Sequence, residues 1–300
     1  MVLINFKIMK KKFINQKRPD WIKIKLFSNF SNINFLKNEI QKNKLNSVCQ
    51  EAKCPNLQEC FSRKIATFMI LGNICTRKCK FCSVSKGKPN TVDEKEPIKL
   101  AKLIKKIKLQ YVVITSVNRD DLKDGGANHF LKCIQKIRKY NSKVKIEILV
   151  PDFRNCAKKA IKIFGKNLPN VFNHNIESIP RIHKIVKPDS NYENSINLLK
   201  DFKKQYPKIP TKSGIMVGMG ETKEELYSVF LDLFRVGVEI LTIGQYLPPE
   251  KNSFPVYKYL RDEDFIEIKK QALFIGFKHV YSGTFIRSSY HAQEQFYGLL

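Results

Sequence analysis

Residues 66–82 read Ala66-Thr-Phe-Met-Ile-Leu-Gly72-Asn-Ile-Cys75-Thr-Arg-Lys-Cys79-Lys-Phe-Cys82. The first seven residues are mostly apolar and end in glycine, which is typical of a buried strand followed by a turn. The cysteines that follow have the spacing C-x3-C-x2-C. An iron–sulfur cube takes one protein ligand per iron, whereas an ordinary structural zinc site needs four ligands. The stretch therefore predicts a cluster-binding loop at the end of a buried strand.

A second cysteine triplet precedes this stretch. Cys49, Cys54 and Cys60 have the spacing C-x4-C-x5-C, so the two triplets together suggest two clusters with different roles. Zinc is an alternative if a triplet borrows a His or a fourth Cys. A disulfide framework is disfavoured, because no secretory signal is evident and 300 residues can form a core without cross-links. Cys133 and Cys156 stand alone and are expected to be buried core residues.

Apolar runs alternate with helical patterns along the rest of the chain, which predicts parallel βα units. About six units fit, fewer than the eight of a closed barrel. We therefore expect an α/β fold with a partial, TIM-like (β/α)6 barrel; a doubly wound sheet is the alternative. The expected strands are 66–72, 111–117, 144–150, 171–176, 213–217 and 240–243, and the expected helices are 97–109, 127–139, 155–164, 192–205 and 222–236.

Polar residues follow five of the expected strands. In parallel βα folds the carboxyl ends of the strands form the rim where ligands bind, so polar residues at five of these ends predict a single site there. The loop with the second triplet opens onto the same rim. The polar residues are Thr115, Ser116, Asn118, Arg119, Asp120, Asp152, His174, Asn175, Glu177, residues 218–221, Gln245 and Tyr246.

The formal charge of +28 invites a nucleic-acid interpretation. However, lysine outnumbers arginine 45 to 10, the lysines are scattered over almost every predicted element, and no nucleic-acid-binding motif accompanies them. We therefore expect no nucleic-acid partner, although a positive field favours encounters with acidic proteins. No apolar stretch is long enough to span a membrane, and residues 1–17 lack a convincing targeting pattern. The sequence predicts a cytoplasmic protein.

The string from Cys75 to Cys82 resembles the cluster motif of the radical S-adenosylmethionine (SAM) superfamily, including the aromatic Phe81 before the last cysteine. In that superfamily three thiolates hold a [4Fe-4S] cluster, and the open iron binds the amino and carboxylate groups of SAM. The resemblance therefore implies that Cys75, Cys79 and Cys82 are the ligands of this cluster.

Within the superfamily, the chain resembles the lipoyl synthase family over about residues 17–298. The resemblance implies a second, auxiliary [4Fe-4S] cluster held by Cys49, Cys54, Cys60 and the distant Ser289. One small departure, Lys123 where the family often has Pro, affects no ligand. The matching motifs are Cys49-Gln-Glu-Ala-Lys-Cys54-Pro-Asn-Leu-Gln-Glu-Cys60, Arg287-Ser288-Ser289-Tyr290, Val117-Asn-Arg-Asp-Asp-Leu-Lys-Asp-Gly-Gly-Ala127, Phe172-Asn-His-Asn-Ile-Glu177, Lys212-Ser-Gly-Ile-Met-Val-Gly-Met-Gly-Glu221, Leu241-Thr-Ile-Gly-Gln-Tyr-Leu247 and Arg18-Pro-Asp-Trp-Ile-Lys-Ile-Lys-Leu26.

The resemblance also implies contacts with SAM. Asp124, Gly125 and Gly126 match the superfamily's glycine-rich segment, which meets the methionine end of SAM, where glycines let the backbone approach closely. Asn118 and Arg119 are expected to shape the same pocket. The expected cofactor-binding set is completed by Phe81 and Glu177; for Glu177 and His174, orienting the ribose and satisfying buried polar groups are equally good interpretations.

The implied reaction is a sulfurtransferase reaction of the radical SAM type. A 5′-deoxyadenosyl radical would remove hydrogen from C6 and C8 of a protein-bound octanoyl chain, and the auxiliary cluster would donate the two sulfurs. The hard oxygen of Ser289 is a poorer match for cluster iron than thiolate, which would make one iron labile. Implied partners are octanoylated lipoyl domains of 2-oxoacid dehydrogenase acyltransferases, the glycine-cleavage H protein, and ferredoxin or flavodoxin as electron donor.

We expect three regions: an N-terminal extension with the auxiliary cysteines (1–62), the radical SAM partial barrel (63–277), and a C-terminal tail with Ser289 that closes the barrel mouth (278–300). A monomer is the default expectation. Competing functions are another radical sulfur-insertion enzyme such as biotin synthase, a non-catalytic electron-transfer or cluster-carrier protein, and a zinc-dependent nucleic-acid binder. The dispersed second-cluster ligands of biotin synthase differ from the compact C-x4-C-x5-C found here.

Overall fold

The sheet is formed by the apolar runs that the sequence marks as strands. The computed structural model describes residues 17–24 and 29–298; residues 1–16 of the expected N-terminal extension and residues 25 and 26 of its lead-in motif lie outside these ranges. The strands run in the order β1-β2-β5-β6-β7-β8-β9-β10, all parallel except β1, which pairs antiparallel with β2. The strands are β1 (Asn46–Ser47), β2 (Thr67–Ile70), β5 (Tyr111–Ser116), β6 (Lys145–Leu149), β7 (Val171–Asn173), β8 (Thr211–Val217), β9 (Ile240–Gln245) and β10 (His279–Gly283).

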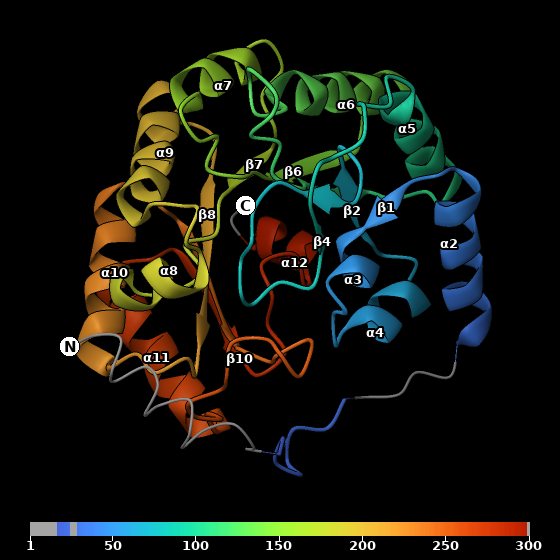
Figure 1. Ribbon diagram of the computed structural model, residues 1–300. Helices are drawn as coiled ribbons and strands as arrows, with labels where there is room; N and C mark the ends of the chain where they lie inside the picture. Colours follow the sequence, from blue (N-terminus) through green and yellow to red (C-terminus); the bar gives the residue numbers. More distant parts are fainter. Residues whose placement is uncertain (1–16, 25–28, 299–300) are drawn as a thin grey trace.

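Helices form an outer layer around the sheet, as Figure 1 shows. The helices after the strands carry apolar stripes that face the strands. Capping residues mark where two of them begin: Thr222 and Glu225 form a capping box, and Asn191 caps the helix that begins at Tyr192. The outer helices are α2 (Phe30–Lys42), α5 (Glu96–Lys106), α6 (Ala127–Tyr140), α7 (Ala157–Phe164), α8 (Pro180–Val186), α9 (Tyr192–Gln205), α10 (Lys223–Arg235) and α11 (Asp262–Ile275). The expected partial α/β barrel is confirmed.

One parallel strand of the main sheet was not expected. β10 adds to the sheet beside β9, in register from His279 opposite Ile240 to Gly283 opposite Gly244, although residues 278–300 were assigned to a tail. Only Val280 in this strand is fully buried, so its sequence lacks the apolar run that marks the other strands. The six expected strands are therefore joined by a seventh parallel strand.

The barrel is open between β1 and β10, and segments from near both ends of the chain come together beside the opening. The short helices α3 (Val48–Glu51) and α4 (Leu57–Ser62) lie on this side, whereas α12 (Ala292–Tyr297) lies in the middle of the barrel in the view of Figure 1. Asn56 joins the two ends directly, because its Nδ2 donates to the Phe285 carbonyl at 2.7 Å. The two strands β3 (Ile74–Cys75) and β4 (Ser85–Lys86) form a small separate sheet in the cysteine loop.

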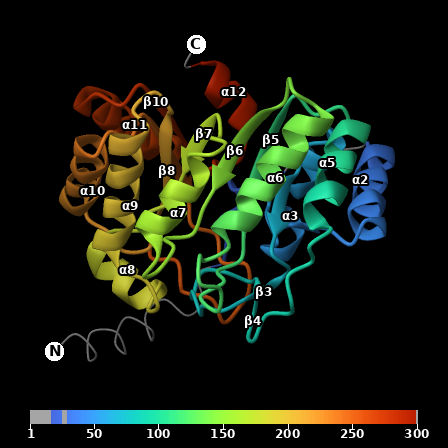
Figure 2. The ribbon, with the colours of Figure 1, turned by 90° about the horizontal axis from the view of Figure 1, so that it is seen from above.

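Helix α12 and the cysteine loop lie at opposite ends of the barrel, as Figure 2 shows. The helix packs at the start of β5, where the rings of Phe296 and Tyr111 are 5.6 Å apart. The tail was expected to close the mouth at the other end. Its segment Arg287–Ser289 does line the cavity at the mouth, while α12 itself plugs the end where the strands begin.

A buried polar network lies inside the barrel above α12. Lys212 and Glu147 are both fully buried and are 3.0 Å apart, and Glu147 also accepts hydrogen bonds from Tyr111 and Asn173. Every polar atom removed from water here needs a partner. The pair therefore fixes the relative positions of β6 and β8 beneath the mouth.

We expect Lys212→Met to destabilise the protein by about 3–5 kcal/mol, because it leaves the Glu147 carboxylate buried without its cation. The double variant Lys212→Met/Glu147→Gln should recover much of this loss, since no charge then remains unpaired and the side-chain amide oxygen at position 147 still accepts from Tyr111 and Asn173. Thermal unfolding of the three proteins, followed by circular dichroism, tests this. Equal midpoints for the single variant and the parent would contradict it.

Candidate functional site

The candidate site lies at the carboxyl ends of the strands. Here a cavity of about 330 Å³, called the front cavity below, is bounded by the loops after β2, β5, β6 and β7 and by the tail. This is the position predicted from the polar strand ends. Residues of both triplets line it, so the structure brings together two cysteine groups that are separate in sequence. The cysteines that line it are Cys49, Cys54, Cys75, Cys79 and Cys82.

Backbone and side-chain amides surround the sulfur of Cys75. Its Sγ accepts from the backbone N–H of Arg77 and of Asn118, both at 3.4 Å, and the Asn118 Nδ2 lies at 3.6 Å. Hydrogen bonds to cluster sulfurs stabilise negative charge there and tune the reduction potential of a cluster. The Asn118 contact confirms that the loop after β5 reaches the cysteine motif.

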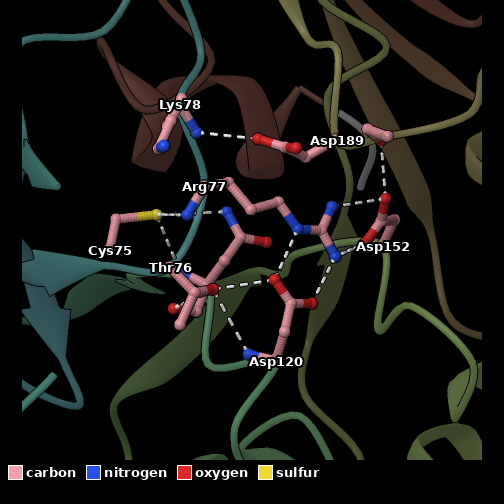
Figure 3. Close-up of polar contacts among 9 residues, drawn as sticks. Cys75, Thr76, Arg77, Lys78, Asp120, Asp152 and Asp189 are labelled. Carbon is pink, nitrogen blue, oxygen red and sulfur yellow. Dashed lines mark hydrogen bonds and ion pairs between the residues drawn. The ribbon is translucent and has the colours of Figure 1, made fainter. Parts of the chain in front are cut away.

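Arg77, inside the cysteine motif, anchors the loop through a buried ion-pair network, which Figure 3 shows. Its guanidinium donates to Asp120 at 2.9 and 2.7 Å and to Asp152 at 2.7 Å. Asp152 also accepts from Ser190 at 2.6 Å. The arginine lowers the pKa of both carboxyl groups against the opposing effect of burial. The loop after β2 is thus bound to the loops after β5 and β6.

Further contacts hold the same loop from the α8 side. The Lys78 backbone N–H donates to the Asp189 carboxylate at 3.0 Å (Figure 3), and the Lys80 N–H donates to the Val186 carbonyl at 2.8 Å. The spacing of three cysteines within a loop says nothing about how the loop is held. The structure shows that it is fixed on two sides before any ligand binds.

The thiols of the radical SAM triplet are close enough to influence one another. The pKa of Cys79 is raised to about 12, chiefly by burial; Lys187 lowers it, and Cys82 and Cys75 add smaller increases. Burial also raises the pKa of Cys82. Thiols in this environment stay protonated unless a metal replaces the protons. Three neighbouring soft donors that need a positive charge fit an iron–sulfur cluster.

The auxiliary triplet is assembled locally by α3 and α4. Cys49 is the second residue of the short helix α3, and its backbone N–H donates to the capping Ser47 hydroxyl at 3.2 Å; Cys60 lies on α4, and Cys54 comes between the two helices. Burial raises the pKa of Cys54 to about 11 with a contribution from Cys49, and burial followed by Cys49 and Cys54 raises that of Cys60. Because these thiols influence one another, Cys49, Cys54 and Cys60 lie close together. Three neighbouring soft donors fit a second iron–sulfur cluster, as they do in the other triplet.

The tail brings Ser289 to the auxiliary cysteines. Ser289 borders the front cavity with Cys49 and Cys54, and it borders a second cavity with Cys60. Beside it, Asn175 donates to the Ser288 hydroxyl at 3.2 Å. Arg287 lies close enough to Cys54 and Glu177 for both to influence its guanidinium, whose pKa burial lowers. Ser289 therefore lies where a fourth ligand is expected; its bond to iron stays a prediction.

The residues expected to contact SAM divide into two groups. Phe81, Asn118 and Glu177 line the front cavity, as does His174. Arg119 does not; it is 3 % exposed, donates to the Leu71 carbonyl at 3.2 Å and pairs with Asp121. It therefore ties the loop after β5 to the end of β2.

Asp124, Gly125 and Gly126 are also absent from the residues that line this cavity. Asp124 accepts from the backbone N–H groups of Gly126 and Asn128 at the start of α6. Gly126 has φ +91°, and a Cβ there would lie 2.3 Å from a methyl group of Leu71. Turn geometry and close packing thus account for these residues, and their contact with SAM stays a prediction.

Two polar groups of the front cavity have roles that the sequence did not settle. Lys187 was not named as a site residue, and His174 had two equally good interpretations. Lys187 is 9 % exposed, lines the cavity, and acts on Cys79, His174 and Glu177. His174 donates through Nδ1 to the Val150 carbonyl at 2.8 Å, and burial lowers its pKa to about 4. It is therefore neutral, and its Nε2 has no partner among the described residues. Nothing in the spacing of Lys187 among many surface lysines marks it as buried.

No group of three or more His, Cys, Asp or Glu side chains is arranged to hold a single metal ion in the described part of the chain. The ligands of a cube bind irons at separate corners and need not converge on one point. In residues 17–24 and 29–298, no helix is long and apolar enough to cross a membrane.

Comparisons with known proteins agree with this geometry. Residues 69–233 match the model of the radical SAM superfamily. The chain is 55% identical over 280 residues to lipoyl synthase of Buchnera aphidicola subsp. Cinara cedri, covering 93% of this chain and 90% of that protein. It is 54% identical to lipoyl synthase of Photorhabdus laumondii, covering 93% and 87%. The chain belongs to the lipoyl synthase family. It is a radical SAM enzyme that inserts sulfur.

Solved structures support the fold of this lipoyl synthase family member. The hydrogenase maturase HydG from Carboxydothermus hydrogenoformans superposes with a TM-score of 0.58 at 17% identity, covering 99% of this chain and 68% of that one. Methylornithine synthase (PylB) gives 0.55 at 14% identity, covering 71% and 62%. At these identities the likeness shows the fold alone.

We expect Arg77→Leu to lose the radical SAM cluster while the auxiliary cluster remains. The substitution leaves buried Asp152 unpaired, which costs about 3–5 kcal/mol and frees the cysteine loop. Iron analysis after anaerobic reconstitution should therefore fall from about eight to about four irons per chain. Arg235→Leu, which removes an arginine that is 70% exposed on α10, is the matched control. Full iron loading of Arg77→Leu would contradict the anchoring role.

His183 on α8 gives a prediction about pH. Its ring is buried, with no hydrogen-bond partner in the described part of the chain, and burial followed by Lys187 lowers its pKa to about 4. The unfolded chain takes up this proton near pH 6.5, so stability falls as the pH decreases from there towards 4, by up to about 1.4 kcal/mol per unit.

His183→Leu should remove this contribution and leave only that of His174, which has the same sign. Thermal midpoints of the variant should therefore fall less steeply than those of the parent between pH 6.5 and 5. Parallel curves would show that the ring is solvated or paired.

Proposed function

We propose that this enzyme inserts sulfur at C6 and C8 of a protein-bound octanoyl-lysine, with sulfur drawn from an auxiliary [4Fe-4S] cluster. One observation supports this most strongly: Cys49 and Cys54 line the same cavity as Cys75, Cys79 and Cys82. A sulfur donor has to lie beside the carbon from which hydrogen is removed. A cavity lined by cysteines of both triplets meets this requirement.

We assign the radical SAM cluster to Cys75, Cys79 and Cys82, and the auxiliary cluster to Cys49, Cys54, Cys60 and Ser289. When bound, the first with SAM supplies the radical that removes hydrogen from an unactivated carbon, and the second supplies sulfide. The protein contributes position and charge. The amides of Arg77 and Asn118 stabilise the Cys75 thiolate, and the Arg287 guanidinium favours the Cys54 thiolate.

Polar groups that line the front cavity suit the amino-acid end of SAM. Lys187 provides a buried cation for a carboxylate close to Cys79, and Glu177 provides an acceptor whose pKa burial raises. The unpartnered Nε2 of neutral His174 accepts a hydrogen bond from a hydroxyl or ammonium group. We propose these residues in addition to Asp124, Gly125 and Gly126, whose contact with SAM stays a prediction.

Apolar side chains that line the same cavity suit the octanoyl chain. A hydrocarbon is bound by removal of apolar surface from water, and closure against water protects a radical intermediate. The apolar residues around the cavity are Val48, Met69, Val84, Val117, Leu149, Val150, Met216 and Leu247.

Partners follow from charge and from the reaction. The formal charge of +28 favours acidic carriers, so octanoylated lipoyl domains of 2-oxoacid dehydrogenase acyltransferases and the glycine-cleavage H protein are the proposed substrates. Ferredoxin or flavodoxin is the proposed electron donor. A monomeric state and a cytoplasmic location stay predictions. A cluster carrier would not need the polar groups that line the front cavity.

The test is to incubate the anaerobically reconstituted enzyme with SAM, reductant and an octanoyl-lysine peptide and to weigh the peptide. We expect a gain of two sulfurs with a loss of two hydrogens. Cys49→Ala should abolish this product while 5′-deoxyadenosine still forms. Cys133→Ala is the matched control, because Cys133 is buried on α6 in the hydrophobic core.

The outcomes separate the hypotheses. Formation of 5′-deoxyadenosine without a mass change in the peptide would overturn the substrate and keep the radical chemistry. Neither product, with all iron loaded, would favour the cluster carrier. A product retained by Cys49→Ala would overturn the auxiliary cluster as donor.

A further inference from the structure

A second cavity lies behind the auxiliary cysteines, on the side away from the front cavity. This back cavity has a volume of about 200 Å³. It lies between α4, the early parts of β2 and β5, and the tail that leads into α12. Its lining consists of Glu59, Cys60, Arg63, Ile65, Ala66, Thr67, Tyr111, Val113, Ser289, Tyr290, His291, Ala292, Gln293 and Glu294.

Ser289 separates the two cavities. Among the described residues it alone borders both, whereas Cys49 and Cys54 border only the front cavity and Cys60 only the back cavity. The expected ligands of the auxiliary cluster are therefore divided between two spaces. An iron held by the serine oxygen would be adjacent to the back cavity as well as to the front.

Polar contacts hold the Ser289 segment against α4. The Tyr290 hydroxyl donates to Glu59 Oε2 at 2.8 Å, and His291 Nε2 lies 3.4 Å from Glu59 Oε1. Glu59 directly precedes Cys60, and Tyr290 directly follows Ser289. One carboxylate thus links the neighbours of two ligands that come from opposite ends of the chain. We call Glu59, Tyr290 and His291 the latch.

The backbone at the latch is constrained. His291 has φ +54°, in the left-handed region that non-glycine residues rarely adopt, and its Nδ1 lies 2.7 Å from Glu294 Oε1. Gln295 Nε2 donates to the Tyr290 carbonyl at 2.7 Å. The turn after Ser289 is therefore held by side chains, and the loss of one of them should loosen it.

The chemistry of the back cavity suits ferrous iron in transit. Carboxylate and imidazole groups are ligands that ferrous iron accepts, and Glu59, His291 and Glu294 provide them at the wall. The Glu294 side chain is 69% exposed and that of Arg63 is 50% exposed, whereas that of Glu59 is only 14% exposed. The wall thus runs from solvent-accessible groups to buried ones that adjoin Ser289.

We propose that the back cavity is the path by which the iron bound to Ser289 leaves and is replaced, and that the latch sets the rate. This rests on the proposed function, because it requires the auxiliary cluster. A cube with two ferric and two ferrous irons loses one ferrous iron and becomes a three-iron cluster with two ferric irons and one ferrous iron. The serine oxygen takes up one proton, so charge and electrons balance without an oxidant.

With this path, the substrates bind in the front cavity and iron passes through the back cavity. SAM and the octanoyl chain occupy the front during reaction, so iron that left by that side would have to pass both. A separate route removes this conflict. It also predicts that iron exchange continues while the front cavity is filled.

The test follows iron release to bipyridine from anaerobic enzyme that carries both clusters. SAM is present without reductant, so the front cavity is occupied and no turnover occurs. Electron paramagnetic resonance after brief oxidation counts the three-iron clusters. Tyr290→Phe removes one hydrogen bond of the latch and should accelerate iron release about three- to tenfold. Tyr227→Phe, at a tyrosine 40% exposed on α10, is the matched control and should leave the rate unchanged.

Two variants are designed to narrow the back cavity. Val113→Phe and Ala292→Leu add bulk at residues that line the back cavity and are 5 % exposed. Either should slow release about threefold or more without changing the number of irons loaded, and two independent positions guard against a folding defect at one.

The results distinguish failure of the iron path from failure of the proposed function on which it rests. Equal release rates in Tyr290→Phe, in the two narrowing variants and in the parent, with sulfur insertion intact, would overturn the path alone. Release that stops when SAM fills the front cavity would assign the exit to the front. A chain that loads only about four irons would overturn the auxiliary cluster and the path with it.

Discussion

The pairing of Arg77 with Asp120 and Asp152 is the interaction on which the site depends. A guanidinium 3 % exposed cannot stay in the fold without anionic partners, and here the two carboxylates come from the ends of β5 and β6. The loop with Cys75, Cys79 and Cys82 is therefore tied to two strands at once. Because Asn118 lies on the same connection as Asp120, the ion pairs also bring its amide to the Cys75 sulfur. The position of one arginine thus fixes the geometry of the triplet.

The elements of the barrel could be predicted because their signals are local. A strand buried on both faces is a continuous apolar run, as in β2, whose four residues are all buried. The helices between strands show their apolar stripes and their caps within a few residues. β10 has no such signal, since only Val280 among its residues is fully buried. It forms because β9 offers an unpaired edge, and the sequence of β10 alone does not show that.

The ligands of the site were predictable for a different reason, because their spacing resembles a known family. Spacing does not show what a residue contacts in space. Asp124 and Gly126 are held at the start of α6 and against Leu71, and the contact of this segment with SAM stays a prediction. Lys187 and Glu59 went unnoticed because their partners are distant in sequence. Tyr290, the partner of Glu59, is 231 positions away. Such pairs depend on the closed fold, which composition and periodicity do not specify.

The auxiliary cysteines and Ser289 meet where segments from near the two ends of the chain come together, and this arrangement suits the proposed cluster that is consumed. Cys49 and Cys60 lie on two short helices and Cys54 lies between them, and the Asn56 side chain and the Glu59 latch join this segment to the tail. Neither contact is a large hydrophobic interface, so the serine side of the site can open at a cost of a few hydrogen bonds, each worth about 1 kcal/mol. The three cysteines, in contrast, pack in or against the hydrophobic core. A cluster bound as we propose would lose iron first at Ser289 and keep its three thiolates, which is the order of events that repeated rebuilding would require.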